Sequence, residues 1–173
     1  MKDRQRNYFD ICETCNILCC QNVKPPITSN RKVMITNFTG SPNYFETDQY
    51  TYPKQDKDGF CVFFDKQTRK CRIQRVKPET CVAGPVTFDI NHKTGKVEWY
   101  LKRGKICPLA GFLYFHKDLL QEHLRHAKKE LLNLIKEISP KELKVLMEIE
   151  EKEIFKIAES DLSDTRKNKR HGV

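Results

Sequence analysis

The sequence predicts a small, irregular α+β domain centred on bound metal, with two β-hairpins and a C-terminal helical hairpin. Three observations predict it. Eight cysteines lie within the first 107 residues, two pairs of β-favouring segments flank turn residues, and apolar side chains recur every three to four positions after Pro108. With 173 residues, 38% of them hydrophobic and 32% charged, the chain is long enough for one domain with a modest core.

The segments before residue 60 predict little regular structure. Residues 8–20 predict a turn or short helical segment, which Pro25-Pro26 ends. Thr28-Ser29-Asn30 predicts the cap of a short helix through Ile35, because these side-chain oxygens accept the free N–H groups of a first helical turn. Residues 37–59 are rich in Pro, Asn, Asp, Thr and Tyr without a clear period, so we expect a long loop with room for one strand.

Two hairpins are predicted in the middle of the chain. Residues 60–64 and 70–73 favour strands and are separated by a turn-like break, so a hairpin brings the cysteines of these two segments close together. Residues 87–90 and 97–101 flank a second turn, in which Gly95 is available for a positive φ. Together the hairpins predict a small antiparallel sheet.

The sequence after Pro108 predicts two antiparallel helices. Ser139-Pro140-Lys141-Glu142 combines a cap, a first-turn proline and a glutamate three residues after the cap, which predicts a second helix to about Glu159. We therefore divide the chain into a cysteine-cluster domain with its packing helix (1–138), a second helix (139–159) and a disordered basic tail (160–173). The apolar stripe of the first helix is Leu109, Leu113, Leu120, Leu124, Ala127, Leu131, Ile135 and Ile138.

The eight cysteines are the candidate metal ligands. A C-x-x-C step lets two thiolates face one ion across a tight turn. Adjacent side chains diverge in extended and in helical backbone, so Cys19 and Cys20 are expected to face different centres. Eight thiolates then suit two four-cysteine sites or one larger polynuclear cluster, and two centres or a bridged pair are preferred. The candidate ligands are Cys12, Cys15, Cys19, Cys20, Cys61, Cys71, Cys81 and Cys107.

The order of these cysteine segments resembles a known family. It is similar to the YkgJ-type cysteine cluster family, whose members are described as zinc- or iron-chelating domains, and the resemblance runs from about Cys12 to Cys107. It rests on Cys12-x2-Cys15-x3-Cys19-Cys20, Phe60-Cys61-Val62-Phe63, Cys71-Arg72-Ile73, and Lys77-Pro78-Glu79-Thr80-Cys81 followed by Pro85.

The resemblance implies a chelating domain, and similar proteins have been described as Fe–S oxidoreductases. This chain departs from the family pattern at two places: Lys77 stands where an arginine is usual, and Val82-Ala83-Gly84 replaces an Arg-x-aromatic step. A similar cysteine set occurs in flagellin lysine methylases. No Gly-x-Gly turn follows a convincing strand here, so no methyl-donor site is visible.

Zinc is the preferred metal, with iron or a [4Fe-4S] cluster as the alternative. Both accept tetrahedral thiolate ligands, and a cysteine followed by proline, as in Cys107-Pro108, is a feature of some Fe–S sites. The spacing C-x2-C-x3-C reverses the order found in radical enzymes that cleave S-adenosylmethionine. Four disulfides are the remaining alternative, because the cysteine count is even.

Three functions remain open: metal chelation, Fe–S oxidoreductase or electron-transfer chemistry, and zinc-stabilised nucleic-acid binding. The formal charge of +9 falls to about +5 if two Zn²⁺ ions each bind four thiolates, so the basic surface only weakly indicates an acidic protein partner or nucleic acid. No apolar stretch of signal-peptide or membrane-spanning length is present, so the expected location is cytoplasmic, without a membrane partner.

The histidines are not predicted to be ligands. His116 lies on the apolar stripe and is expected to be a hydrogen-bonded core residue. His123 and His126 lie at the edge of the stripe and are expected to be solvated.

Overall fold

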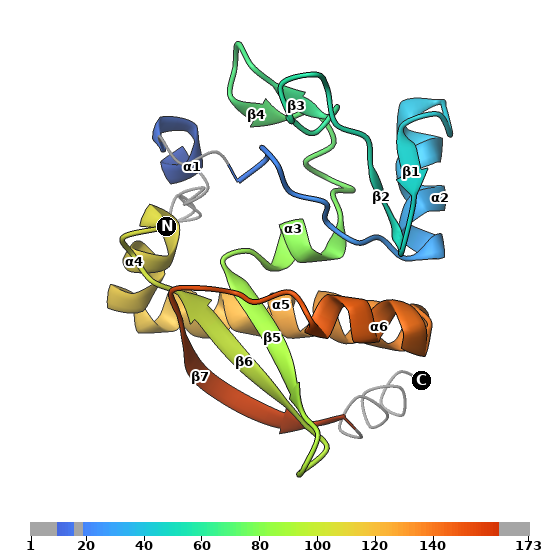
Figure 1. Cartoon of the computed structure of the whole chain (residues 1–173). Helices are drawn as coiled ribbons and strands as arrows, with labels where there is room; N and C mark the ends of the chain where they lie inside the picture. Colours follow the sequence, from blue (N-terminus) through green and yellow to red (C-terminus); the bar gives the residue numbers. More distant parts are fainter. Residues whose placement is uncertain (1–9, 16–18, 163–173) are drawn as a thin grey trace, which may run out of the picture.

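The chain folds into two parts with one short helix, α3, between them (Figure 1). The structure is a computed structural model, and it describes residues 10–15 and 19–162. Short elements make up the N-terminal part: α1 (Asp10–Thr14), α2 (Ser29–Thr39), β1 (Phe45–Thr47), β2 (Thr51–Pro53), β3 (Phe64–Asp65), β4 (Lys70–Cys71) and α3 (Glu79–Ala83). Longer elements make up the C-terminal part: β5 (Val86–Asn91), β6 (Lys96–Lys102), α4 (Pro108–Phe115), α5 (Lys117–Glu137), α6 (Pro140–Met147) and β7 (Ile154–Asp161). The predicted α+β class is confirmed.

The C-terminal part contains the larger core. Strands β5, β6 and β7 form an antiparallel sheet in that order, and one face of the sheet packs against α5. Alternate residues of β6 point to this face, so Val97, Trp99 and Leu101 are fully buried. Leu131 and Leu134 of α5 pack against them. Leu131 belongs to the predicted apolar stripe, whereas Leu134 does not.

The N-terminal part has a much smaller core. Its buried cluster consists of Ile35, Phe63 and Ile73, and partly buried Cys61 and Cys71 pack against it. Thr28 caps α2 by accepting a hydrogen bond from the Arg31 backbone N–H, as predicted, and the helix ends at Gly40 with φ of +73°. Instead of one strand, the loop that follows contains the β1–β2 hairpin.

Both predicted hairpins are present. Phe64 of β3 pairs with Cys71 of β4, although these strands are only two residues long. Strands β5 and β6 pair from Val86 opposite Leu101 to Asn91 opposite Lys96, and Gly95 in their turn has φ of +69°. The second hairpin gains a third strand, β7, that was not predicted.

The prediction of a helix over residues 139–159 is wrong beyond Met147. The capping box at Ser139 forms as expected, but α6 has only eight residues and residues 154–161 are a strand. Lysine and glutamate favour helices, yet here they lie on β7 and form cross-strand ion pairs with β6: Lys156 with Glu98 at 2.9 Å and Glu159 with Lys96 at 2.7 Å. The second helix of the predicted C-terminal helical hairpin is therefore short, and strand β7 takes the place of its second half.

The single long helix predicted after Pro108 is also interrupted. His116 leaves the helical region with φ of −118° and ψ of 80°, and it separates α4 from α5. Its side chain is exposed, so the prediction of a core histidine is wrong. Of the predicted disordered tail, Ser160 and Asp161 belong to β7, and residues 163–173 lie outside the described part of the chain.

A buried polar contact joins the two parts at α3. Glu79 is 2% exposed and accepts a hydrogen bond from Thr28 Oγ1 at 2.7 Å. Its carboxylate also lies 3.4 Å from Arg31 Nε, and Arg31 forms a second ion pair with Glu130 of α5. These contacts fix α2 and α3 against the long helix, and α3 carries Cys81.

Within the described residues, none of the helices combines the length and the apolar character needed to cross a bilayer.

Candidate metal centre

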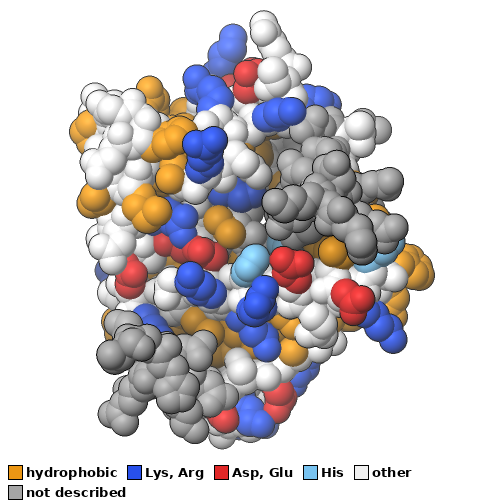
Figure 2. All heavy atoms as spheres, turned by 180° about the vertical axis from the view of Figure 1, so that it is seen from behind, with side chains coloured by type: hydrophobic (Ala, Val, Ile, Leu, Met, Phe, Trp, Pro, Cys, Tyr) orange, Lys and Arg blue, Asp and Glu red, His pale blue; other side chains and the backbone are white. Residues whose placement is uncertain are grey.

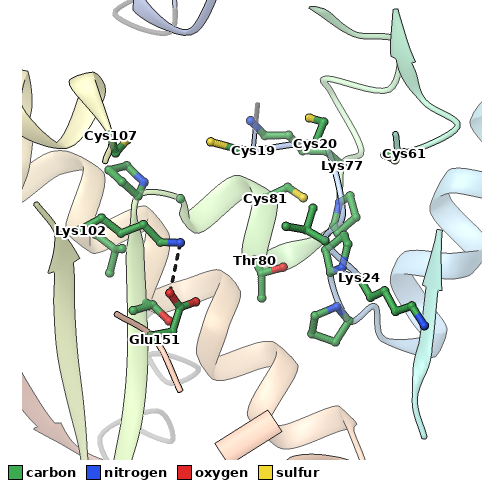
Figure 3. A pocket seen from close by; sticks show the side chains of 18 of the residues that line it. Cys19, Cys20, Lys24, Cys61, Lys77, Thr80, Cys81, Lys102, Cys107 and Glu151 are labelled. Atoms are coloured by element: carbon green, nitrogen blue, oxygen red, sulfur yellow. Dashed lines mark ion pairs between the residues drawn. The ribbon is translucent and has the colours of Figure 1, made fainter. Parts of the chain in front are cut away.

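All eight cysteines line one cleft between the two parts of the molecule. The cleft encloses about 1060 Å³, at the upper end of the volumes usual for ligand sites. The described cysteines are free thiols, which does not support the disulfide alternative. Cys12 and Cys19 are exposed, and the other six cysteines are partly buried. Figure 3 shows five of these cysteines around the cleft.

Six short elements and turns bring these residues together. Cys12 lies in α1 and Cys15 directly follows it. The turn at Cys19-Cys20 is held against the next segment because the Cys61 N–H donates to the Cys20 carbonyl at 2.8 Å. The remaining cysteines occupy β4 (Cys71), α3 (Cys81) and the position before α4 (Cys107).

Four thiols lie around α3. The pKa of Cys20 is raised to about 12, mainly by burial and then by the nearby thiols of Cys61, Cys71 and Cys19, in that order. Burial likewise raises the pKa of Cys81, with Cys20, Cys61 and Cys71 as the thiols that add to it. We call Cys20, Cys61, Cys71 and Cys81 the second thiol group.

The other four thiols gather at the α1 side of the cleft. The pKa of Cys12 is raised to about 11, mainly by burial and then by the nearby thiols of Cys107, Cys19 and Cys15. Burial also raises the pKa of Cys107, to which Cys19 and Cys15 add. We call Cys12, Cys15, Cys19 and Cys107 the first thiol group.

The two groups meet at the adjacent pair Cys19-Cys20. Figure 3 shows the Cys19 side chain extending toward Cys107, whereas the Cys20 side chain points away from it. This is the divergence expected of neighbouring side chains. Cys12 with its thiol neighbours and Cys81 with its own thus form two sets of four, which adjoin at Cys19-Cys20.

The thiols are grouped but do not converge. In the described part of the chain, no three Cys, His, Asp or Glu side chains lie close enough to hold one metal ion. The donor type and the number in each group fit tetrahedral thiolate ligation. Binding therefore requires the sulfur atoms of each group to move toward a common point.

Two lysines supply positive charge to these thiols. Burial raises the pKa of Cys12 in the first group and of Cys20, Cys71 and Cys81 in the second, and the positive charge of Lys77 offsets part of this rise. Lys77 stands where the family resemblance leads one to expect an arginine. Burial also raises the pKa of Cys19, and Lys102 opposes this rise. Lys102 forms an ion pair with Glu151 at 3.2 Å, which Figure 3 shows.

One histidine, His123, is buried next to the helix that carries Cys81. His123 is 2% exposed, contrary to the prediction that it is solvated, and its Nε2 lies 3.0 Å from the Ala83 carbonyl of α3. Burial lowers its pKa, so the neutral ring is favoured. Because α3 crosses α5 at this point, the histidine supports the helix that carries Cys81.

The fold and the cleft define a small cysteine-cluster domain of the metal-chelating class. Residues 11–108 match the sequence pattern of the CxxCxxCC family, described as "putative zinc- or iron-chelating domain". The match covers more than half of the chain and includes all eight cysteines, so the chain belongs to this family, as the resemblance predicted. Comparison with curated proteins and with solved structures gave no match.

Metal affinity is expected to rise steeply with pH. The raised pKa values of Cys12 and Cys20 keep these thiols protonated near pH 7 in the metal-free chain, so a metal ion must displace their protons. For each proton that the metal displaces, the apparent association constant rises about tenfold per pH unit. Competition with a chromophoric zinc chelator at pH 6, 7 and 8 measures this slope, and an affinity that does not change with pH would count against thiolate ligation.

Proposed function

We propose that this chain binds two metal centres through its eight thiolates, one centre for each thiol group. The first thiol group supplies Cys12, Cys15, Cys19 and Cys107, and the second supplies Cys20, Cys61, Cys71 and Cys81. The observation that carries the proposal is that all eight thiols line one cleft, with Cys15, Cys19 and Cys107 as the thiol neighbours of Cys12 and with Cys20, Cys61 and Cys71 as those of Cys81. Membership of a zinc- or iron-chelating family supports it.

Zinc is the metal that we propose first. Four thiolates satisfy Zn²⁺ without further ligands, and such closed sites stabilise folds that have little core of their own. The buried cluster of the N-terminal part has only three residues, Ile35, Phe63 and Ile73, which fits this role.

Iron–sulfur chemistry with electron transfer is the second candidate. The exposure of Cys12 and Cys19 favours it, because a centre near the surface can exchange electrons with a docked partner. Nucleic-acid binding has less support, since the face in Figure 2 mixes Lys and Arg with Asp and Glu rather than presenting one basic patch.

Metal analysis of protein purified without oxygen tests the proposal. We expect about two metal equivalents per chain. Colourless protein containing zinc supports the first candidate, whereas brown protein with thiolate–iron charge-transfer absorption near ~400 nm supports the second. Protein that binds no metal after reduction and incubation with Zn²⁺ or Fe²⁺ would contradict both.

A further inference from the structure

Arg69 connects the segments that carry the two thiol groups. It is the last residue of the β3–β4 turn, in which the Asp65 carboxylate accepts hydrogen bonds from the Gln67 and Thr68 backbone N–H groups at 2.8 and 3.1 Å. Two residues further on, Cys71 belongs to the second thiol group. From there the Arg69 side chain crosses to the first group, where Nη2 donates to the Cys15 carbonyl.

A second N–H group of the Arg69 guanidinium has no acceptor in the described part of the chain. Arg69 lines the cleft, and its Nε is buried without a hydrogen-bond partner among the described residues. Leaving a buried donor without an acceptor is unfavourable, because the group has lost its hydrogen bonds to water, so Nε is expected to gain an acceptor in the functional state. The backbone at Arg69 also has φ of +56°, a conformation that few residues other than glycine adopt readily.

A loaded thiolate centre is the acceptor that this cleft offers. Four thiolates around Zn²⁺ carry a net charge of about −2, and their sulfur atoms accept hydrogen bonds from nearby N–H groups. A guanidinium presents several donors in a fixed fork, so one group can hold a carbonyl and a sulfur at the same time. Lysine, with a single flexible ammonium group, does this less well.

We propose that Arg69 is a positioning residue for the first metal centre. Its Nη2 holds the Cys15 backbone in place, and its Nε donates a hydrogen bond to a ligated thiolate of that centre. Through the β3–β4 hairpin the same side chain ties the first thiol group to the second. This inference rests on the proposed function, since it presupposes metal bound to the thiol groups.

Cobalt titration of two variants tests this role. Arg69→Gly removes the side chain and suits the positive φ, so the hairpin is retained. Arg69→Lys keeps the charge but not the fork. Arg75→Gln is the matched control, because Arg75 is exposed and does not line the cleft, yet the substitution removes the same charge. Co²⁺ is added to each reduced, metal-free chain, and sulfur-to-cobalt charge transfer reports binding.

The expected results differ among the three variants. Arg69→Gly binds one equivalent as the unsubstituted chain does and the other about 10- to 100-fold more weakly. The weakened equivalent leaves Cys12, Cys15, Cys19 and Cys107 open to alkylation. Arg69→Lys binds two equivalents, with charge transfer at lower energy because one sulfur has lost its N–H donor. Arg75→Gln matches the unsubstituted chain.

Two results would overturn the inference. One is Arg69→Gly binding both equivalents with unchanged affinity and spectrum. The other is Arg69→Lys restoring the affinity and the unshifted spectrum, which would reduce Arg69 to a simple charge. If the unsubstituted chain itself binds no Co²⁺, the proposed function fails rather than the role of Arg69.

Discussion

Removing metal from the loaded chain is expected to unfold the cysteine-bearing part and to leave the sheet and α5 folded. The N-terminal cluster of Ile35, Phe63 and Ile73 buries little apolar surface, and Cys61 and Cys71 pack directly against it. The C-terminal cluster contains eleven buried residues, and Cys107 is the one described cysteine among the partly buried side chains that pack against it. Structural zinc contributes about 10–16 kcal/mol of apparent folding free energy in small domains, far more than three buried side chains supply.

Hydrogen exchange before and after chelation measures this difference. The amides of Cys61 and Arg72 are hydrogen-bonded within the N-terminal part, to the Cys20 and Phe63 carbonyls at 2.8 Å each, and are expected to lose protection. Amides of β6 and α5 are expected to keep it. A matched control is Leu134→Ala, which opens a cavity in the C-terminal core at a cost of about 2–5 kcal/mol and should affect that part first. Uniform loss of protection after chelation would contradict a separate metal-dependent part.

Replacing Cys19 and replacing Cys20 are expected to remove metal from different centres, although the two residues are adjacent. Cys19→Ser takes one ligand from the first thiol group, and Cys20→Ser takes one from the second, because their strongest thiol neighbours lie on opposite sides. Serine has nearly the same size as cysteine, but its hydroxyl is a poor ligand for a metal ion that prefers thiolates. Each variant should therefore retain about one equivalent out of two, measured by metal analysis after gel filtration.

Val23→Ser is the control for the two cysteine variants. Val23→Ser introduces the same hydroxyl at a residue that lines the cleft and is 39% exposed, and it should leave both equivalents bound. Loss of both metals in each cysteine variant would contradict two separate centres and favour one bridged centre. Two retained equivalents in both variants would remove Cys19 and Cys20 from the ligand set.

The sequence predicted the elements that local patterns determine. The Thr28 and Ser139 caps, the turn at Gly95 and the β3–β4 hairpin all depend on residues that are near neighbours in the chain. The divergence of Cys19 and Cys20 was also predicted, because it follows from backbone geometry alone.

Features that depend on distant contacts were not predicted. Residues 154–161 contain helix-favouring Lys and Glu and become a strand only because β6 offers them partners: Trp99 Nε1 donates to Ser160 Oγ at 2.9 Å, and Glu98 pairs with Lys156. His123 was expected in solvent because its helix position lies beside the apolar stripe, whereas α3 crosses there and covers it. Arg69 had no sequence signal at all, since its role arises from a contact with Cys15 across the cleft.

Stepwise demetallation with cysteine alkylation tests the central claim most directly. The loaded chain is treated with increasing chelator, unprotected thiols are alkylated, and mass spectrometry of peptides locates each modified cysteine. Two centres of four thiolates predict that cysteines become reactive in two sets, Cys12, Cys15, Cys19 and Cys107 in one and Cys20, Cys61, Cys71 and Cys81 in the other. Reactivity that appears in mixed sets, or at all eight cysteines in a single step, would contradict the two-centre assignment.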